Sequence, residues 1–594
     1  MPAPLQKTLK ETFGFSSFRP NQDEIISAIM AGRDTFAVMP TGGGKSLCYQ
    51  LPAILQEGTC LVISPLISLM KDQVDAALDL GIKAAFINSS LPPAERARVL
   101  ADFRNGDLDL LYLAPERLAA GFASELKQCP ISFVAVDEAH CISEWGHDFR
   151  PDYLALSQLK DLLPGCPLAA FTATATDQVQ EDIISRLRLN APFTLRASFN
   201  RPNLFYQVSR RESVLGQIER AIASQGDQPG IVYRLSRADV EKTAVHLAKR
   251  GVAALPYHAG LPPDTRADHQ EKFNRDQCQV IVATVAFGMG IDKSNVRFVI
   301  HGDLPKNMEG YYQETGRAGR DGEPAHCLLF YNRGDVGRLG SFIEKMGSQA
   351  EQRLAWQKLN DMTRLAETAV CRRRQLLAYF GEEFEGENCG ACDVCQQGVE
   401  LVDGSKHAQM VMSAIFRSGQ RFGAAHVIDI VCGARTKKIQ QFHHDLLKTY
   451  GVGANQAKPY WRRLTDAMAA HGLIKSDPKR YNALVLTPAG EDVLYGRKPF
   501  SYQQLKGETA AQPRTAAAPS DHNQELFNQL RDLRRRLAEA ADVPPYVVFS
   551  DRSLREMAAY LPATPPEFLA IHGVGQQKLE RYGEDFIKII KEFS

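Results

Sequence analysis

Residues 34–46, DTFAVMPTGGGKS, decide the fold: a short apolar run passes into a glycine-rich turn, and a helical segment begins near Lys45. Glycines let the backbone approach phosphate closely, and a helix N-terminus offers N–H groups and a positive dipole end. Lys45 would reach the β- and γ-phosphates of a nucleotide, and the Ser46 hydroxyl would hold Mg²⁺. The expected cradle consists of Thr41, Gly42, Gly43 and Gly44. The strict motif asks for glycine at Met39, so a plain glycine-rich turn is the alternative.

Two further motifs supply the other groups that phosphoryl transfer needs. Residues 134–140, VAVDEAH, end an apolar strand in two carboxylates: Asp137 can hold the Mg²⁺ water shell, and Glu138 can orient and deprotonate the attacking water. The stretch QETGRAGRDG carries Arg317 and Arg320. An arginine supplied in trans stabilises transition-state charge and is worth ~10³–10⁵ in rate. If these arginines lie in another lobe, hydrolysis is coupled to lobe closure. Taken alone, acidic pairs and surface arginines are usually just solvated.

The first 345 residues alternate short apolar runs with helical segments, which is typical of an α/β fold with parallel sheets. The strand candidates are 34–39, 60–64, 108–113, 133–136 and 168–171, then 231–233, 253–257, 280–283 and 298–301. The pattern predicts two α/β lobes, 1–200 and 201–345, of which only the first contains a phosphate loop.

The rest of the chain changes in charge and composition. The 594 residues are 44% hydrophobic and 23% charged, which excludes wholesale disorder, and the net charge is only +1. Residues 406–500 contain 15 Lys and Arg against 6 Asp and Glu, a net of +9, whereas 521–594 contain 10 against 12, a net of −2. We expect helices and a hairpin at 474–487 in the basic segment, a flexible linker at 501–520 and a small helical bundle at 521–594.

The cysteines indicate a metal site in a reducing compartment. No apolar run is long enough to cross a membrane, and the N-terminus lacks the apolar segment of a signal peptide, so we expect reduced thiols in the cytoplasm. Four of the twelve form a C-x17-C-x2-C-x2-C cluster: Cys371, Cys389, Cys392 and Cys395. Tetrahedral zinc takes four thiolates, and the x2 spacing lets neighbouring thiolates converge on one ion. An iron–sulfur cluster and a redox pair are the alternatives.

Together these motifs resemble those of superfamily-two helicases, and specifically of bacterial RecQ DNA helicases, over essentially the whole chain. The helicase form of the phosphate loop does not require the leading glycine. The stretch 15–22, FSSFRPNQ, resembles the family's adenine-recognition motif, which implies that Gln22 pairs with the adenine edge, that Arg19 supports it and that Phe15 packs near the base. Further stretches that match the family are 64–69, 114–117, 171–176, 257–261 and 283–292. The resemblance makes Arg320 the better candidate for the arginine finger.

The stretch 141–153, CISEWGHDFRPDY, resembles the aromatic-rich loop that RecQ enzymes are thought to use to sense single-stranded DNA and signal to the ATP site. Trp145 and Phe149 offer ring faces on which bases stack, worth ~1–3 kcal/mol each, and Arg150 can meet a phosphate. His147 lies in the same loop and is included among the expected DNA contacts. The alternative is that these aromatic residues belong to the core.

The resemblance also assigns the C-terminal modules. It implies a helical subdomain at 346–405 in which the four cysteines hold structural zinc. It implies a winged helix at 406–500 that tracks a duplex backbone by salt-dependent contacts, with Tyr481 in the hairpin as a strand-separating wedge. It identifies 521–594 as an HRDC domain, an auxiliary DNA contact in the family. Because this domain is acidic here, a protein partner and a local basic patch both stay open; the patch would comprise Arg534, Arg535, Arg536, Lys578 and Arg581.

The resemblance implies a motor that uses ATP and Mg²⁺, carries Zn²⁺, moves 3′→5′ on single-stranded DNA and unwinds duplex, forked or junction DNA in recombination, repair and the damage response. The implied partners are single-stranded and duplex DNA, single-stranded DNA-binding protein and recombination factors. The resemblance also implies that the protein itself is a monomer associated with the nucleoid. Two alternatives stay open. An RNA helicase fits the catalytic motifs, but the aromatic loop and the C-terminal modules favour DNA. A DNA-structure clamp with a nucleotide switch is disfavoured by the full set of catalytic residues.

Overall fold

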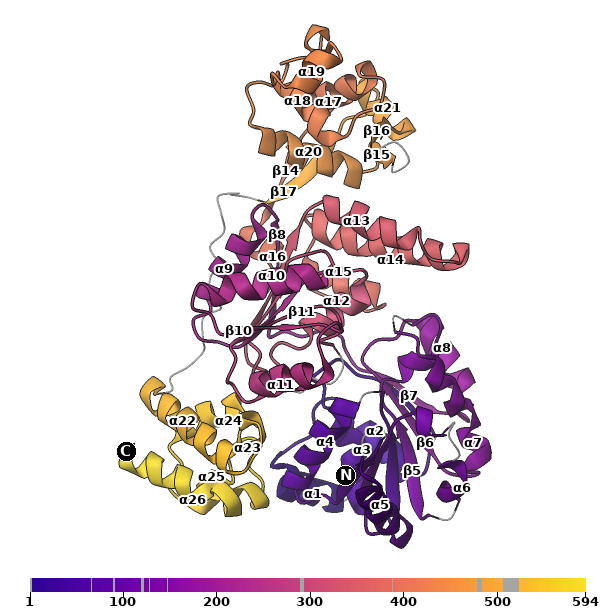
Figure 1. Cartoon of the computed structure of the whole chain (residues 1–594), viewed down its shortest axis with the longest axis vertical. Coiled ribbons are helices and arrows are strands. Elements are labelled where there is room, and N and C mark those ends of the chain that lie inside the picture. The colour runs from indigo at the N-terminus through magenta and orange to yellow at the C-terminus, as the bar shows by residue number, and fades with distance from the viewer. Residues whose placement is uncertain are drawn as a thin grey trace.

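The computed structural model describes residues 3–65, 67–88, 91–118, 122–127, 129–146, 148–288, 293–386, 388–477, 483–505 and 523–593. Figure 1 shows an elongated molecule in which two α/β lobes form the lower and middle parts and a helical module stands alone at the top. The last helical bundle returns to the bottom and lies beside the lobes. Within the described ranges, no helix is both long and apolar enough to cross a membrane.

Lobe 1 is built on a seven-stranded parallel sheet in the order β3-β4-β2-β5-β6-β1-β7. Phe36 and Val38 of β1 enter one hydrophobic core and Ala37 another, so the strand is buried on both faces and its sequence is continuously apolar. The strands are β1 (Thr35–Val38), β2 (Thr59–Ile63), β3 (Ala84–Ile87), β4 (Leu110–Leu113), β5 (Ile131–Val136), β6 (Leu168–Thr172) and β7 (Phe193–Arg196). The helices are α1 (Ala3–Phe13), α2 (Gln22–Met30), α3 (Lys45–Leu55), α4 (Ile67–Asp79), α5 (Pro93–Asn105), α6 (Ala123–Leu126), η2 (Ala139–Ile142), η3 (Pro151–Gln158), α7 (Leu159–Leu162) and α8 (Asp177–Arg186).

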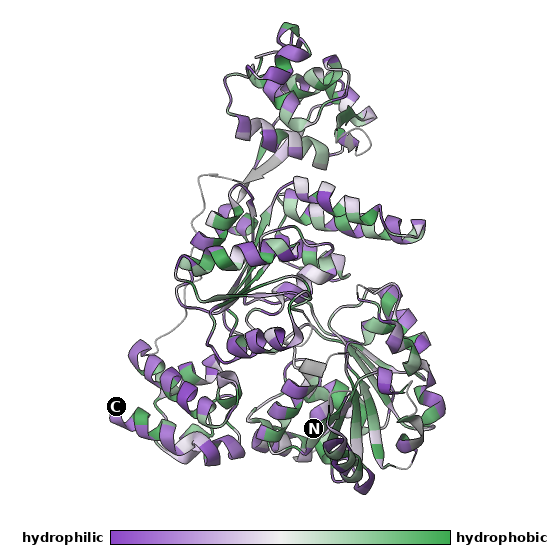
Figure 2. Ribbon diagram, in the orientation of Figure 1, coloured by the Kyte–Doolittle hydropathy of each residue, from purple (hydrophilic) through white to green (hydrophobic). Residues whose placement is uncertain are grey.

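Lobe 2 has a six-stranded parallel sheet in the order β10-β11-β9-β12-β13-β8. Its strands are β8 (Leu204–Arg210), β9 (Gly230–Tyr233), β10 (Ala254–Tyr257), β11 (Val280–Ala283), β12 (Phe298–His301) and β13 (Ala325–Tyr331), and its helices are α9 (Val214–Ala223), α10 (Arg237–Ala248), α11 (Pro263–Asn274) and α12 (Met308–Thr315). Figure 2 shows apolar residues along both sheets and hydrophilic residues on the helices that cover them. Every strand expected from the sequence is present to within two residues at each end.

A helical extension connects lobe 2 to the upper module. It comprises α13 (Gly334–Ile343), α14 (Gln349–Glu367), α15 (Arg372–Tyr379) and α16 (Asp393–Gln397). The expected linker at 501–520 is wrong at its start, because β17 (Ser501–Leu505) pairs antiparallel with β14 (Val399–Asp403). Backbone hydrogen bonds make this pair, and they do not depend on the polar side chains that suggested a linker. Residues 506–520 lie outside the described ranges.

The upper module has its own core around the fully buried Trp461. It consists of α17 (Ser405–Arg417), α18 (Ala424–Cys432), α19 (Lys437–Gln441), η4 (His444–Leu446), α20 (Lys458–Ala470), β15 (Ile474–Asp477), β16 (Ala483–Leu486) and α21 (Pro488–Leu494). The expected hairpin is confirmed as the antiparallel pair β15 and β16. Tyr481, the expected wedge, lies outside the described residues.

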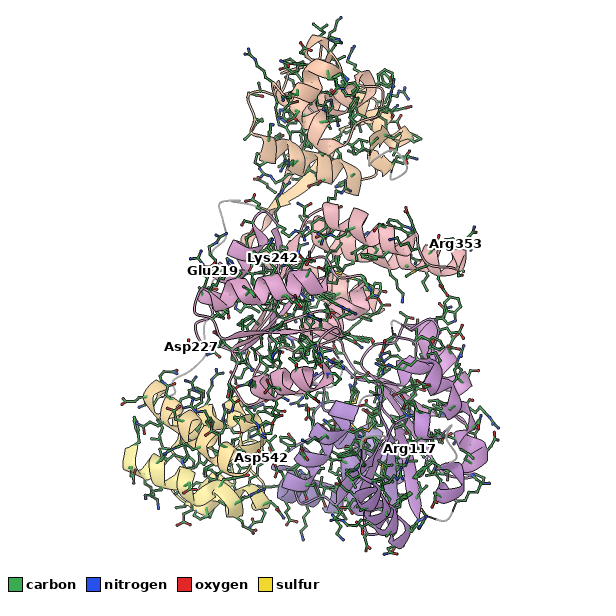
Figure 3. The ribbon with its side chains drawn as sticks, in the orientation of Figure 1. Arg117, Glu219, Asp227, Lys242, Arg353 and Asp542 are labelled. Atoms are coloured by element: carbon green, nitrogen blue, oxygen red, sulfur yellow. The ribbon has the colours of Figure 1, made fainter. Side chains whose placement is uncertain are left out.

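The C-terminal bundle packs around Leu530, Phe549 and Phe586. Its helices are α22 (Gln524–Ala540), α23 (Pro545–Val548), α24 (Asp551–Tyr560), α25 (Pro565–Phe568) and α26 (Gln576–Phe593). Although it is remote in sequence from the lobes, it contacts both of them. Arg581 pairs with Asp79 of lobe 1 at 2.9 Å, and Asp542, labelled in Figure 3, pairs with Arg275 of lobe 2 at 2.7 Å.

Candidate functional site

The glycine-rich turn joins β1 to α3, and its conformation requires glycine. Gly44 is the N-cap of α3 with φ 82°, and Gly42 has φ 77°, both in the left-handed region that other residues rarely adopt. A Cβ on Gly43 would lie 2.8 Å from the Pro40 carbonyl oxygen. Lys45 begins α3, so its ammonium group lies on the same residue as one of the first N–H groups of the helix, which have no acceptor within the helix. Both kinds of donor are available to one bound anion. This arrangement suits a polyphosphate.

The two carboxylates follow β5, the strand whose end lies beside the glycine-rich turn. The Lys45 Nζ lies 3.4 Å from Glu138 Oε1 and 3.9 Å from Asp137 Oδ1. All three side chains are 14–17% exposed, so water and a nucleotide can reach them. One lysine beside two carboxylates leaves a net negative charge available for a divalent cation, as phosphoryl transfer requires.

His140 connects these carboxylates to the next strand. Its Nδ1 lies 3.3 Å from Glu138 Oε2 and 2.9 Å from the Thr172 hydroxyl at the end of β6, and the ring is fully buried. Thr172 lies within the stretch 171–176 that was matched to the family on sequence alone. A displacement of Glu138 can therefore be transmitted through His140 to the segment that follows β6. The sequence did not predict this contact between His140 and Thr172.

Two of the residues expected to recognise adenine, Gln22 and Arg19, contact the same turn from the α1–α2 side. Gln22 Nε2 donates to the Gly44 carbonyl at 3.1 Å, and Gln22 Oε1 accepts from the Arg19 N–H at 2.9 Å. The Arg19 guanidinium donates to the Gly42 carbonyl. Burial, and then the positive charge of Arg201, lower the pKa of Arg19. Cationic groups thus crowd around the turn and would gain from an anionic ligand.

Lobe 2 brings the arginine motif against the phosphate loop, but its two arginines differ. A Cβ on Gly42 would lie 3.3 Å from Arg320 Cγ, so the base of Arg320 borders the turn. Arg317 is buried within lobe 2, where a Cβ on Gly288 would lie 3.5 Å from its Nη2. Burial raises the pKa of Tyr233, and the adjacent Arg317 opposes that rise. The geometry therefore places Arg320 at the seam and Arg317 behind it.

The aromatic-rich loop is divided between core and surface. Tyr153 is fully buried and its hydroxyl donates to the Asp137 carbonyl at 3.0 Å, which ties the loop to the catalytic strand. Trp145 is 46% exposed and Phe149 is half-buried. Arg150 donates to Asp148 and to the Pro65 carbonyl. The core alternative thus holds for Tyr153 and not for Trp145, while His147 lies outside the described residues.

The four cysteines form one compact cluster whose ligand atoms all lie within 4.8 Å of one another. Thiolates about 2.3 Å from a common ion lie roughly 3.8 Å apart, so four sulfurs at this spacing fit a tetrahedral metal. Hydrogen bonds within the cluster lower the pKa of Cys371 and raise those of Cys389 and Cys392, so the four thiols titrate as one coupled group. The neighbouring Arg372 pairs with Asp393 at 3.0 Å, and Asp393 accepts from the Val208 N–H of β8. The cluster is thereby fixed to lobe 2.

The basic patch considered for the C-terminal bundle is reduced by two members, since Arg534 and Lys578 are engaged internally while Arg535, Arg536 and Arg581 are exposed. Arg534 is buried and pairs with Asp551 at 2.8 Å, and Lys578 donates to the Val547 carbonyl at 2.6 Å. Burial lowers the pKa of Lys578 to about 8. The 573–575 turn packs on lobe 1: the Gly573 N–H donates to the Gly14 carbonyl at 3.1 Å.

Comparisons with known proteins match the whole chain. Family models match in five consecutive segments: DEAD/DEAH box helicase (19–183), helicase conserved C-terminal domain (213–322), RecQ zinc-binding (333–396), RQC domain (398–511) and HRDC domain (523–590). The chain is 43% identical to the ATP-dependent DNA helicase RecQ of Pasteurella multocida, over 99% of this chain and 94% of that one. It is 40% identical to the ATP-dependent DNA helicase RecQ of Bacillus subtilis, over 99% and 98%.

These matches settle the alternatives for the cysteine cluster, because a zinc-binding family model covers it and four sulfurs are in place. They also agree with the fold: two parallel-sheet lobes, then the zinc-binding, RQC and HRDC domains in order. With ~40% identity sustained over nearly its full length and all five domains in sequence, the chain belongs to the RecQ family of helicases.

Proposed function

We propose that the chain is an ATP-driven DNA motor that moves 3′→5′ on single-stranded DNA and unwinds duplex, forked and junction DNA in recombination, repair and the damage response. The observation that carries the proposal is the seam between the lobes, where Arg320 of lobe 2 borders the phosphate loop of lobe 1 at Gly42, and Lys45, which follows that loop, pairs with Glu138. A nucleotide held at such a seam links its hydrolysis to movement of the lobes.

Each residue at the seam has one task in this scheme. The turn 41–44 and Lys45 hold the β- and γ-phosphates, while Gln22, Arg19 and Phe15 hold the base. Glu138 takes the proton of the attacking water, and Arg320 stabilises the charge that develops on the transferred phosphoryl group, with Arg317 supporting it from behind. Mg²⁺ neutralises phosphate charge when it is bound, and Ser46 and Asp137 are the residues that would hold it.

The proposed DNA contacts lie on several modules. Trp145, His147, Phe149 and Arg150 would meet the single strand, and the RQC winged helix with Tyr481 would hold and split the duplex. We assign the lobes to 1–200 and 201–345, the zinc-binding subdomain to 346–405, the winged helix to 406–500 with β17 added, and the HRDC domain to 521–594. We propose a monomer in the nucleoid that works with single-stranded DNA-binding protein and recombination factors.

Stimulation of ATP turnover separates the proposed function from an RNA helicase. Oligodeoxynucleotides of mixed sequence should raise steady-state ATP hydrolysis strongly, whereas RNA of the same sequence should raise it little. Equal stimulation by RNA would favour the RNA alternative. ATP-dependent binding of DNA without any ATP turnover would favour a DNA clamp that is switched by nucleotide binding.

Trp145→Ala tests the aromatic loop. Loss of one stacked base costs ~1–3 kcal/mol, so the affinity for single-stranded DNA should fall about 5- to 150-fold. DNA stimulation of ATP hydrolysis should fall with it, while DNA-independent turnover is retained. Fluorescence anisotropy and a coupled ATPase assay measure both quantities. Trp145→Phe, which keeps a ring face, should retain most of the binding; equal damage by both variants would show that stacking is not the contact.

Cys392→Ala tests the zinc site. One of four ligands is lost, so zinc content measured by mass spectrometry should fall well below one ion per chain. The thermal unfolding midpoint should fall as well, because metal binding contributes folding free energy to such clusters. Cys432→Ala removes a thiol outside the cluster and should leave both values unchanged. Full zinc occupancy in Cys392→Ala would contradict the assigned ligand set.

A further inference from the structure

Arg201 lies in the segment that joins the two lobes, between β7 and β8, and belongs to none of the motifs discussed above. Its guanidinium uses both of its NH₂ groups. Nη1 donates to the Thr41 carbonyl in the phosphate loop and lies 3.4 Å from the Gly316 carbonyl. Nη2 donates to the carbonyls of Ala318 at 3.0 Å and Gly319 at 2.8 Å. One side chain thus binds the phosphate loop of lobe 1 and the arginine motif of lobe 2.

The segment that carries Arg201 is itself held firmly. The Phe199 ring stacks on Phe380 with centroids 4.4 Å apart, and the Phe199 N–H donates to Glu382 at 2.7 Å. The Tyr312 hydroxyl, from α12 just before the arginine motif, donates to the Phe199 carbonyl at 2.9 Å. On the other side, Asn203 Nδ2 donates to the Gly319 carbonyl at 2.9 Å. Arg201 therefore projects from a platform fixed to lobe 2.

The acceptors of Arg201 belong to two lobes, which the proposed function requires to move relative to each other. The guanidinium can reach Thr41 and Gly319 together only when the lobes are close, because its NH₂ groups have a fixed geometry. Two further contacts depend on the lobes being close. Arg320 borders Gly42, and Thr41 borders Gly316, where a Cβ on Gly316 would lie 3.1 Å from Thr41 Cβ. When the lobes separate, the Thr41 carbonyl loses its hydrogen bond from Arg201 and is hydrated instead.

We propose that Arg201 is a positioning residue for ATP hydrolysis: it joins the phosphate loop to the arginine motif and so sets Arg320 at the nucleotide when the lobes close. The inference rests on the proposed function, because it presumes hydrolysis at the seam. Arg201 itself acts on backbone carbonyls and performs no chemistry. A lysine at this position keeps the charge but lacks the fork that reaches both lobes at once.

The test compares Arg201→Ala, Arg201→Lys and the control Arg250→Ala, in the full chain with saturating single-stranded DNA. Arg250 is exposed and pairs with Glu219, which Figure 3 labels on the outer side of lobe 2. Misplacing a catalytic group by about 1 Å can lower the reaction rate by up to about 10²-fold. We therefore expect kcat to fall about 10- to 100-fold in Arg201→Ala. The dissociation constant of a fluorescent ADP should change less than about threefold, since lobe 1 keeps its phosphate loop. Arg201→Lys should recover only part of kcat.

A double-mutant cycle with Arg320→Ala separates positioning from general destabilisation. If Arg201 acts through Arg320, the double variant should be no slower than Arg320→Ala alone to within about twofold. Independent, additive losses would overturn the proposal, as would a normal kcat in Arg201→Ala with an unchanged unfolding midpoint. Failure of the proposed function has a different signature, because the parent protein would then show no DNA-stimulated turnover at all.

Discussion

Arg320→Ala is expected to slow DNA-stimulated ATP hydrolysis by about 10³- to 10⁵-fold while nucleotide still binds. The arginine borders the phosphate loop, where a Cβ on Gly42 would lie 3.3 Å from its Cγ, and it comes from the opposite lobe. Its charge is therefore available to the transferred phosphoryl group when the lobes meet, and it is not needed to hold the base or the β-phosphate. Steady-state turnover and equilibrium binding of a fluorescent ADP measure the two effects separately.

Arg317→Ala is the matched control for that experiment. Arg317 is buried beside Tyr233 and Gly288, so its loss should lower the unfolding midpoint and reduce turnover less than the loss of Arg320. If Arg317→Ala were the slower enzyme while remaining as stable as the parent, the assignment of the finger would have to be exchanged between the two arginines.

Lys45→Ala is expected to remove ATP hydrolysis and unwinding together, with turnover reduced by at least about 10²- to 10³-fold. The ammonium group lies close to both carboxylates, 3.4 Å from Glu138 and 3.9 Å from Asp137. Its loss removes the cation that pairs with both acids and would meet the phosphates, so nucleotide binding should weaken as well. Coupled ATPase and strand-displacement assays report the two activities.

Binding of single-stranded DNA by Lys45→Ala should remain close to that of the parent, because Lys45 pairs with Asp137 and Glu138 and is not one of the proposed DNA contacts. Lys242→Ala provides the control, since Figure 3 labels Lys242 on the outer helices of lobe 2. It removes the same charge and should hydrolyse ATP like the parent. Unwinding by Lys45→Ala at the parental rate would show that the phosphate loop is misassigned.

The sequence predicted most of the fold because buried strands of parallel sheets are uninterrupted apolar runs, as in β1 and β11. It missed β7 and β3, which lie at the two edges of the lobe 1 sheet and are only partly buried; β7 (FTLR) contains polar residues, whereas the AAFI run of β3 is apolar throughout. β13 was missed although its CLLF run is a usable signal. The polar SYQQL stretch became β17 because its partner, β14, supplies the backbone bonds from far away in the chain.

The candidate site was predictable wherever its chemistry lies in a contiguous motif, as at the phosphate loop and the acidic pair. Contacts between distant segments were not. Both NH₂ groups of Arg201 donate to backbone carbonyls, which carry no residue signature, and the linking role of His140 depends on Thr172 in another strand. The bundle's charge gave no hint that its 573–575 turn packs on Gly14 or that Arg534 is an internal ion-pair partner. Such contacts follow from tertiary packing alone.

The most direct test of the central claim is strand displacement from a duplex with a single-stranded tail, by the parent protein and by Glu138→Gln. The parent should separate a duplex with a 3′ tail in the presence of ATP and Mg²⁺, and should leave a blunt or 5′-tailed duplex largely intact. Glu138→Gln should bind the same DNA and separate none of it, because the water that attacks ATP is no longer deprotonated. Strand separation by Glu138→Gln at the parental rate, or none by a parent that hydrolyses ATP on DNA, would contradict a motor driven by hydrolysis at the seam.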